Sequence, residues 1–66
     1  MKNNIRLHRV IKGYSQEKLT NLADVSRQTI NALEAAKYVP STVLALRLSK
    51  IPEKSVEDLF ELEEGE

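Results

Sequence analysis

The side chains best suited to specific chemistry in this 66-residue sequence are three polar groups near its middle, Arg27, Gln28 and Asn31. A guanidinium group can donate two hydrogen bonds to the paired acceptors of guanine, and a carboxamide can both donate to and accept from adenine, in the major groove of DNA. At about 100° per residue, the three side chains share one face of a helix. The spacing indicates a surface that reads base edges, but the same residues also suit the solvated face of an ordinary amphipathic helix.

These residues lie in a stretch, Gln16 to Ala35, that is typical of two short helices joined by a tight turn. Ser15 and Ser26 stand where the N-caps of the two helices are expected. Between the helices, Asp24 tolerates the left-handed backbone conformation that a sharp turn needs. The predicted inward side consists of apolar residues at helical spacing: Leu19, Leu22 or Ala23, Val25, Ile30 and Leu33. We therefore expect the second helix to be held by its apolar side and to present its polar side outward.

Boundary residues also predict a first helix, which begins near Asn3 or Asn4 and ends near Lys12, just before Gly13. One side of this helix carries Ile5, His8, Arg9 and Lys12, and the opposite side carries Leu7, Val10 and Ile11. Both sides cannot be core in so small a domain. Either the aliphatic side packs inward, or it is left as an apolar strip for another surface.

Two more helices are predicted in the second half of the chain. Ser41 is the expected N-cap of a fourth helix, which Pro52 ends near residue 50 or 51. Ser55 begins a short fifth helix, with Asp58 in a capping-box position. The apolar residues of these two helices are Val43, Leu44, Leu46, Leu48, Val56, Leu59 and Phe60. We expect an all-α fold, a compact five-helix domain over residues 1–66, with room for a short extended C-terminal segment.

The charges are divided along the chain although the formal net charge is zero. Residues 1–50 carry nine Lys and Arg against three Asp and Glu, whereas residues 51–66 carry one Lys against seven acids. A basic body suits a polyanionic partner, and the acidic tail, residues 61–66, is expected to point away from that partner. The same division also fits a solvated surface with a frayed acidic end.

Several classes of function lack the residues that they need. The sequence has no cysteine and a single histidine, His8, and it contains no nucleophile–base pair or glycine-rich phosphate loop. It has no apolar run near the roughly 20 residues of a membrane span and no apolar leader at its N-terminus. We expect a soluble cytoplasmic protein that is not an enzyme and has no cofactor, metal site, membrane contact or evident small-molecule ligand. Because so short a chain buries little apolar surface, dimerisation is plausible.

The stretch SQEKLTNLADVSRQTINALE, followed by KYVPS and later by EDLF, resembles the lambda-repressor/Cro-like (XRE-type) helix-turn-helix transcriptional regulators. The resemblance extends from Ile5 to about Leu62 and implies a small helix-turn-helix domain, with its motif at residues 16–35, that binds double-stranded DNA sequence-specifically. It implies a phosphate contact for Gln16 and backbone contacts for Lys37 and Tyr38. It also implies a recognition helix, at about residues 27–35, that enters the major groove with Ser26, Arg27, Gln28, Thr29 and Asn31 near the DNA.

The resemblance also implies a structural ion pair between Arg9 and Glu34. An inward Arg9 would leave the strip of Leu7, Val10 and Ile11 wholly or partly outside. The sequence differs from the family pattern after the recognition helix, where Ala35-Ala36 replaces a pair such as Asn-Gly. Because alanine is disfavoured in the left-handed conformation, we expect the recognition helix to run longer, toward Tyr38.

The simplest function consistent with these features is that of a repressor that binds an inverted-repeat operator as a homodimer. We expect Phe60 and Leu62 to anchor the dimer contact, because these apolar residues occur at an otherwise acidic end. The aliphatic strip of the first helix is the competing interface. The alternative function is an antitoxin-like protein-interaction module, for which the charged tail leaves room.

Overall fold

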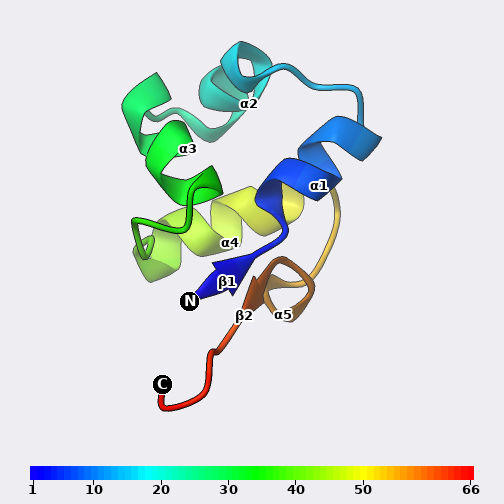
Figure 1. Ribbon diagram of the computed structural model, residues 1–66. Helices are drawn as coiled ribbons and strands as arrows, with labels where there is room; N and C mark the ends of the chain where they lie inside the picture. Colours follow the sequence, from blue (N-terminus) through cyan, green and yellow to red (C-terminus); the bar gives the residue numbers. More distant parts are fainter.

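The computed structural model describes residues 1–66 as five short helices and a two-stranded sheet (Figure 1). In chain order these elements are β1 (Lys2–Asn3), α1 (Ile5–Ile11), α2 (Gln16–Ala23), α3 (Arg27–Glu34), α4 (Thr42–Lys50), α5 (Val56–Leu59) and β2 (Phe60–Glu61). The five-helix fold and the short extended segment near the C-terminus are both confirmed. The partner of that segment was not predicted: β2 pairs antiparallel with β1, with Asn3 opposite Phe60.

Serine side chains begin four of the five helices. The hydroxyl groups of Ser15, Ser26, Ser41 and Ser55 each accept a hydrogen bond from the backbone N–H three residues on, as predicted for N-caps. At Ser55 the Asp58 carboxylate also accepts from the serine N–H, which completes a capping box. The start of α1 differs, because Asn3 Oδ1 accepts from the N–H of Ile5 at 3.2 Å while Asn4 makes no side-chain cap.

Helices α2 and α3 are each followed closely by a residue in the left-handed backbone conformation. Asp24 has φ 56° at the turn between α2 and α3, as its residue type predicts. Ala36 has φ 59°, so the prediction that α3 runs on toward Tyr38 is wrong. The N–H of Lys37 donates to Ala32 O at 2.9 Å and the N–H of Ala36 donates to Leu33 O at 3.0 Å, which is the Schellman pattern of helix termination. These two hydrogen bonds offset a cost of about 1 kcal/mol for placing alanine in this conformation.

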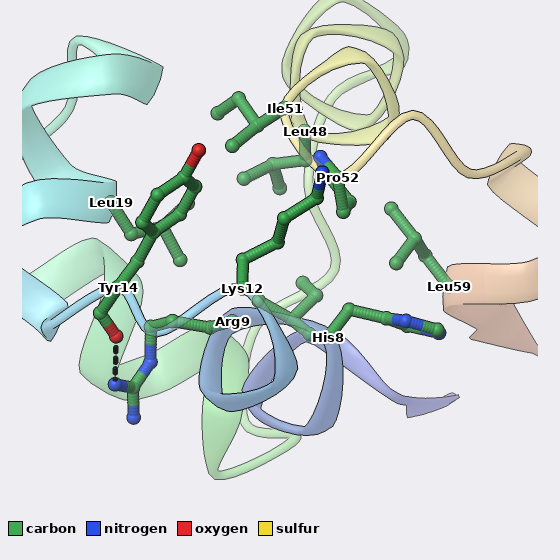
Figure 2. A pocket seen from close by; sticks show the side chains of 10 residues that line it. His8, Arg9, Lys12, Tyr14, Leu19, Leu48, Ile51, Pro52 and Leu59 are labelled. Atoms are coloured by element: carbon green, nitrogen blue, oxygen red, sulfur yellow. Dashed lines mark hydrogen bonds between the residues drawn. The ribbon is translucent and has the colours of Figure 1, made fainter.

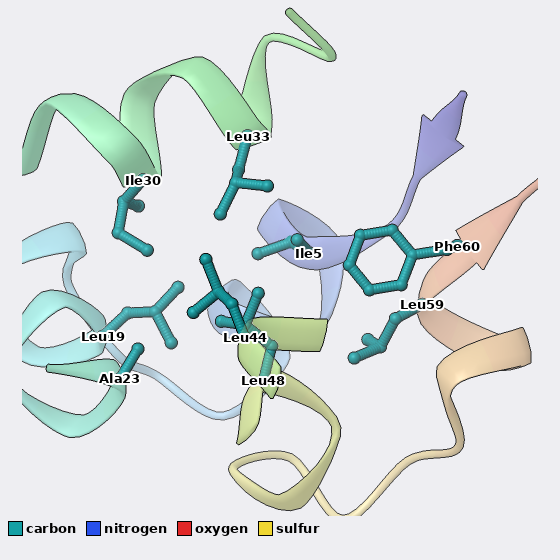
Figure 3. Close-up of a cluster of buried hydrophobic side chains, with 9 residues drawn as sticks. All are labelled: Ile5, Leu19, Ala23, Ile30, Leu33, Leu44, Leu48, Leu59 and Phe60. Carbon is teal, nitrogen blue, oxygen red and sulfur yellow. The ribbon is translucent and has the colours of Figure 1, made fainter. Parts of the chain in front are cut away.

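A single cluster of nine apolar side chains joins all five helices (Figure 3). It contains Ile5, Leu19, Ala23, Ile30, Leu33, Leu44, Leu48, Leu59 and Phe60. The inward residues predicted for α2 and α3 are confirmed, with Ala23 rather than Leu22 as the buried one. In α4 only the pair at i, i+4 spacing, Leu44 and Leu48, is core, whereas Val43 and Leu46 are exposed because one face of a helix contacts the cluster.

Phe60 belongs to this core rather than protruding from it. Its side chain points toward Ile5 and Leu59 in Figure 3, and the residue is only 9% exposed. The β1–β2 pairing accounts for this position, because the extended backbone after α5 turns Phe60 inward and leaves Leu62 outside. Phe60 is thus a core residue of this chain, and its part in a dimer contact stays a prediction.

Candidate nucleic-acid interface

Helices α2 and α3 are locked together by buried apolar side chains and by the turn between them. Ala23, Ile30 and Leu33 are completely inaccessible to solvent, and Leu19 is nearly so. At the turn, the N–H of Val25 donates to Thr20 O at 3.3 Å, and Arg47 Nη1 on α4 donates to Ala23 O at 3.0 Å. The angle between the two helices is thus fixed by packing, by the left-handed Asp24 and by a cation at the negative C-terminal end of α2.

The outer face of α3 carries the three predicted base-reading residues. Arg27, Gln28 and Asn31 are exposed, and their side chains make no hydrogen bond within the chain. An unpaired guanidinium and two unpaired carboxamides on one face retain all their donors and acceptors for a partner. This geometry meets the requirement for direct readout of base edges in the major groove.

Ser26 and Thr29 have a different role in the structure. Ser26 Oγ accepts from the Thr29 N–H at 3.1 Å and lies 2.9 Å from Thr29 Oγ1. The Ser26 hydroxyl thus caps the N-terminus of α3, and the Thr29 hydroxyl bonds to this cap. Both residues lie at the N-terminal end of α3, next to Arg27 and Gln28.

Gln16 occupies the first position of α2, where a phosphate contact was expected, and it is half-buried. Its Nε2 donates to Glu34 Oε1 at 3.1 Å, a contact that the sequence did not indicate. The backbone N–H groups at this end of α2 lie at the positive end of the helix dipole, which suits a phosphate. Gln16 therefore connects the start of α2 to the last residue of α3.

The ion pair between Arg9 and Glu34 is present and bidentate. Arg9 Nε lies 2.7 Å from Glu34 Oε2, and Arg9 Nη2 lies 3.2 Å from Glu34 Oε1. The two side chains are 12% and 7% exposed, and Arg9 Nη1 also donates to Tyr14 O at 2.8 Å (dashed in Figure 2). With Arg9 turned inward, Leu7, Val10 and Ile11 are all more than half exposed, which confirms the expected outer strip on α1.

Lys37 and Tyr38 follow the Schellman turn at the end of α3, and both are exposed. The turn redirects the chain at Ala36, so these two residues leave the helix axis instead of extending it. Both side chains are therefore accessible to a partner, and a contact with the DNA backbone stays a prediction for them.

The acidic C-terminal residues lie away from this face. Figure 1 shows the C-terminal segment leaving at the opposite end of the molecule from α2. The Met1 ammonium lies 3.5 Å from Glu63 and 3.2 Å from Glu66. Its hydrogen bond to Glu66 raises the pKa of the Met1 amine, while the Glu63 N–H and then the amine lower the pKa of Glu66. The tail is therefore paired with the N-terminus.

The pocket beside the start of α2 gives little space for a small ligand. The pocket between α1, the start of α2 and the end of α4 has a volume of about 10 Å³ (Figure 2), which is about the room for one water molecule. No group of three His, Cys, Asp or Glu side chains is placed to hold a metal ion. None of the helices is both long enough and apolar enough to cross a membrane.

Two short helices joined at a sharp turn, with unpaired polar side chains on the outer face of the second, define a helix-turn-helix domain. A helix-turn-helix family model matches residues 5–59 of the chain. The uncharacterized HTH-type transcriptional regulator YgzD of Bacillus subtilis is 48% identical over 64 residues, which is 97% of each chain. An uncharacterized HTH-type transcriptional regulator of Methanocaldococcus jannaschii is 41% identical over 66 residues and 100% of both chains.

The chain therefore belongs to the helix-turn-helix family of the Cro/C1 (XRE) type, and it is a DNA-binding transcriptional regulator. Members of this family of regulators are not enzymes. The family assignment and the resemblance seen in the sequence agree.

Three contacts of the interface had no local signal in the sequence. They are the hydrogen bonds from Gln16 to Glu34, from Arg47 to Ala23 O and from Asn3 to Leu33 O. Each joins residues at least 18 positions apart. Only the relative placement of the helices brings such groups together.

Proposed function

We propose that the protein is a cytoplasmic transcriptional repressor that binds an inverted-repeat operator as a homodimer, with the whole chain acting as one DNA-binding unit. The observation that carries this proposal is the outer face of α3, where Arg27, Gln28 and Asn31 are exposed and unpaired. These side chains read base edges while α3 lies in the major groove. Repression follows most simply from occupying DNA that the polymerase needs.

The remaining contacts of this proposal position the protein on the DNA backbone. Gln16 and the N-terminal amides of α2 contact one phosphate group, and Lys37 with Tyr38 contacts the backbone beyond α3. Ser26 and Thr29 lie at the reading end of α3 and hold its first turn. Positioning and reading are thus assigned to different residues.

A second copy of the chain supplies the second half-site. Two recognition helices related by a dyad lie about 34 Å apart, which is one turn of DNA, and read an inverted repeat. The supporting feature is an apolar groove of about 390 Å³ between α4, α5 and the N-terminus, whose lining includes Met1, Leu46, Val56 and Phe60. In this revised interface Phe60 forms part of the groove floor, while the exposed Leu46 and Leu62 contact the partner.

Selection of bound sequences from random double-stranded DNA tests the proposal most directly. We expect an enriched inverted repeat with half-sites one helical turn apart. The double substitution R27A/Q28A should abolish the selectivity while circular dichroism shows an unchanged fold. The control K54A also removes one positive charge, at an exposed position in the acidic region, and should keep selectivity. Enrichment of no sequence, or full selectivity in R27A/Q28A, would overturn the proposal.

The dimer surface has a matched test of its own, because two leucines on different faces have similar exposure. Leu46 beside the groove is 51% exposed and Leu7 on the α1 strip is 54% exposed. We expect L46E to sediment as a monomer and L7E to remain a dimer in analytical ultracentrifugation. The reverse result would assign the interface to α1, and a wild-type monomer at high micromolar concentration would exclude a dimer.

The α1 strip also supports a second candidate, an antitoxin-like protein-interaction module. Leu7, Val10 and Ile11 form an exposed apolar surface that neither the reading face of α3 nor the proposed dimer groove uses. This candidate would gain support if the selection enriched no DNA sequence. A selective wild type whose selectivity is unaffected by L7E favours the repressor.

A further inference from the structure

The N-terminal strand reaches the end of the recognition helix through one side chain. Asn3 Nδ2 donates to Leu33 O at 2.7 Å, while Asn3 Oδ1 accepts from the Ile5 N–H at 3.2 Å. The backbone of Asn3 pairs with Phe60 in the two-stranded sheet. One half-buried amide thus connects β1, the start of α1 and the last turn of α3.

The carbonyl oxygen of Leu33 favours a hydrogen-bond donor that carries no negative charge. The last carbonyl groups of a helix have no partner within it and lie at the negative end of its dipole. Leu33 O accepts from the Ala36 N–H at 3.0 Å and takes the Asn3 amide as a second donor. A carboxylate in place of this amide would set a negative oxygen against the carbonyl group.

Asn3 is one of three residues outside α3 whose side chains hold the last turn of this helix. The Glu34 side chain is held from α1 and α2 by Arg9 and Gln16, whereas Leu33 O is held from β1. Side-chain hydrogen bonds from two directions therefore fix the last turn of α3, whereas the first turn has only the hydrogen bonds of its own cap and is otherwise held by the packing of Ile30. An eight-residue helix is about 12 Å long, so a tilt at Leu33 displaces Arg27 and Gln28 at the other end.

We infer that Asn3 is a positioning residue for base reading, which fixes the orientation of α3 relative to the β1–β2 sheet. This inference rests on the proposed function, in which α3 reads DNA. Because Met1 and Phe60 of the same sheet region line the proposed dimer groove, Asn3 also ties each recognition helix to the dimer contact. Hydrogen bonds to base edges need donor–acceptor distances near 2.9 Å, so a small tilt loses selectivity before it loses nonspecific affinity.

The adjacent asparagine provides a matched control. Asn4 Nδ2 donates to Asp58 O at 3.3 Å, at an exposed position, and no hydrogen bond joins Asn4 to α3. N3D and N4D each add one negative charge, one residue apart, so their general electrostatic effect on DNA affinity is the same. N3D keeps an oxygen for the Ile5 N–H but removes the donor to Leu33 O.

The quantity to measure is the ratio of affinity for the selected operator to affinity for random DNA, at one salt concentration. We expect this ratio to fall about tenfold in N3D, the order of effect of leaving a buried acceptor opposite the wrong group, and to stay within about twofold in N4D. Nonspecific affinity should be equal in the two variants. Amide hydrogen exchange at Ala36 and Lys37 should be faster in N3D than in N4D, because both N–H groups bond to the last turn of α3.

The possible results separate the role of Asn3 from the proposed function. If the wild type is selective and N3D and N4D are equally selective, the positioning role of Asn3 is overturned. The proposed function still stands in that case. A wild type that selects no sequence overturns both. If N3D is unfolded at the assay temperature by circular dichroism, the pair N3A and N4A is compared by the same ratio, since N3A removes the donor without adding a charge.

Discussion

The two ends of α3 differ in what their side chains do. At the first turn, Arg27 and Gln28 are exposed and unpaired, and the only side-chain hydrogen bonds are those of the Ser26 cap. At the last turn, Glu34 is paired with Arg9 and Gln16, and Leu33 O accepts from Asn3. A recognition helix needs free donors and acceptors at one end and a fixed position in space. In this chain the two needs are met by different turns of the same helix, so their substitutions should have separable effects.

The largest effect is expected at the fixed end. E34A should lower the free energy of unfolding by about 3 kcal/mol, because it leaves the mostly buried Arg9 guanidinium without its carboxylate. Urea denaturation followed by circular dichroism measures this change. The control E64A removes an exposed carboxylate of the tail and should leave the free energy within about 0.5 kcal/mol of wild type. If E34A changed the free energy of unfolding as little as E64A does, the ion pair would not hold α3.

The free end should respond in selectivity and not in stability. R27K keeps the positive charge but removes the planar fork that donates two hydrogen bonds, so selectivity for the operator should fall about tenfold. Nonspecific affinity and the urea midpoint should remain those of wild type. Loss of stability in R27K would show that the two ends are not independent.

At the turn that ends α3, glycine substitutions at two neighbouring alanines should change the stability in opposite directions. A36G should stabilise the protein by about 0.5–1 kcal/mol, because glycine takes the observed φ of 59° without the steric cost of a Cβ atom. A35G should destabilise it by a similar amount, since Ala35 has φ −83°. Thermal melting of the two variants measures the difference. Destabilisation by both would indicate that Ala36 contributes packing that outweighs its backbone strain.

The smallest effect is expected from pH, acting on the chain ends next to β1. The pKa of the Met1 amine is raised above its ordinary value of 8.0 by Glu66, so its contribution to stability is present below pH 8 and is lost as the pH rises through the raised pKa. Bonds to Ser55 lower the pKa of Asp58, and Glu63 and Met1 lower that of Glu66. Their contributions are present above the ordinary values of 3.8 and 4.5 and are lost as the pH falls through the lowered pKa values.

The thermal midpoint should therefore be highest at about pH 5–8 and fall slightly on both sides. The variants D58N and E66Q should each reduce the acidic decline. An unchanged acidic decline in both variants would place its origin in other carboxylates.

Local features of the fold were readable from the sequence. Ser15, Ser26, Ser41 and Ser55 bond to N–H groups three residues away, so short patterns sufficed to locate four helix starts. The apolar sides of α2 and α3 follow helical periodicity, and the three candidate reading residues lie opposite those sides.

Features set by tertiary contacts were not readable. Alanine propensity favours a longer α3, but the chain turns at Ala36 because two backbone hydrogen bonds close the helix there. In α4, the closely spaced apolar residues do not reveal which face is buried, and the choice of Leu44 and Leu48 over Leu46 depends on the neighbouring helices. Phe60 turns inward because a strand from the other end of the chain pairs with it.

The contact between Met1 and Glu66 has a practical consequence for handling the protein. A purification tag placed before Met1 would replace the ammonium group with a neutral amide and add bulk where the two ends of the chain meet. A tag after Glu66 would leave the ammonium group and its bond to Glu63 in place. Joining the two ends covalently through a short flexible linker should instead give a circular protein that keeps the β1–β2 sheet and resists exopeptidases.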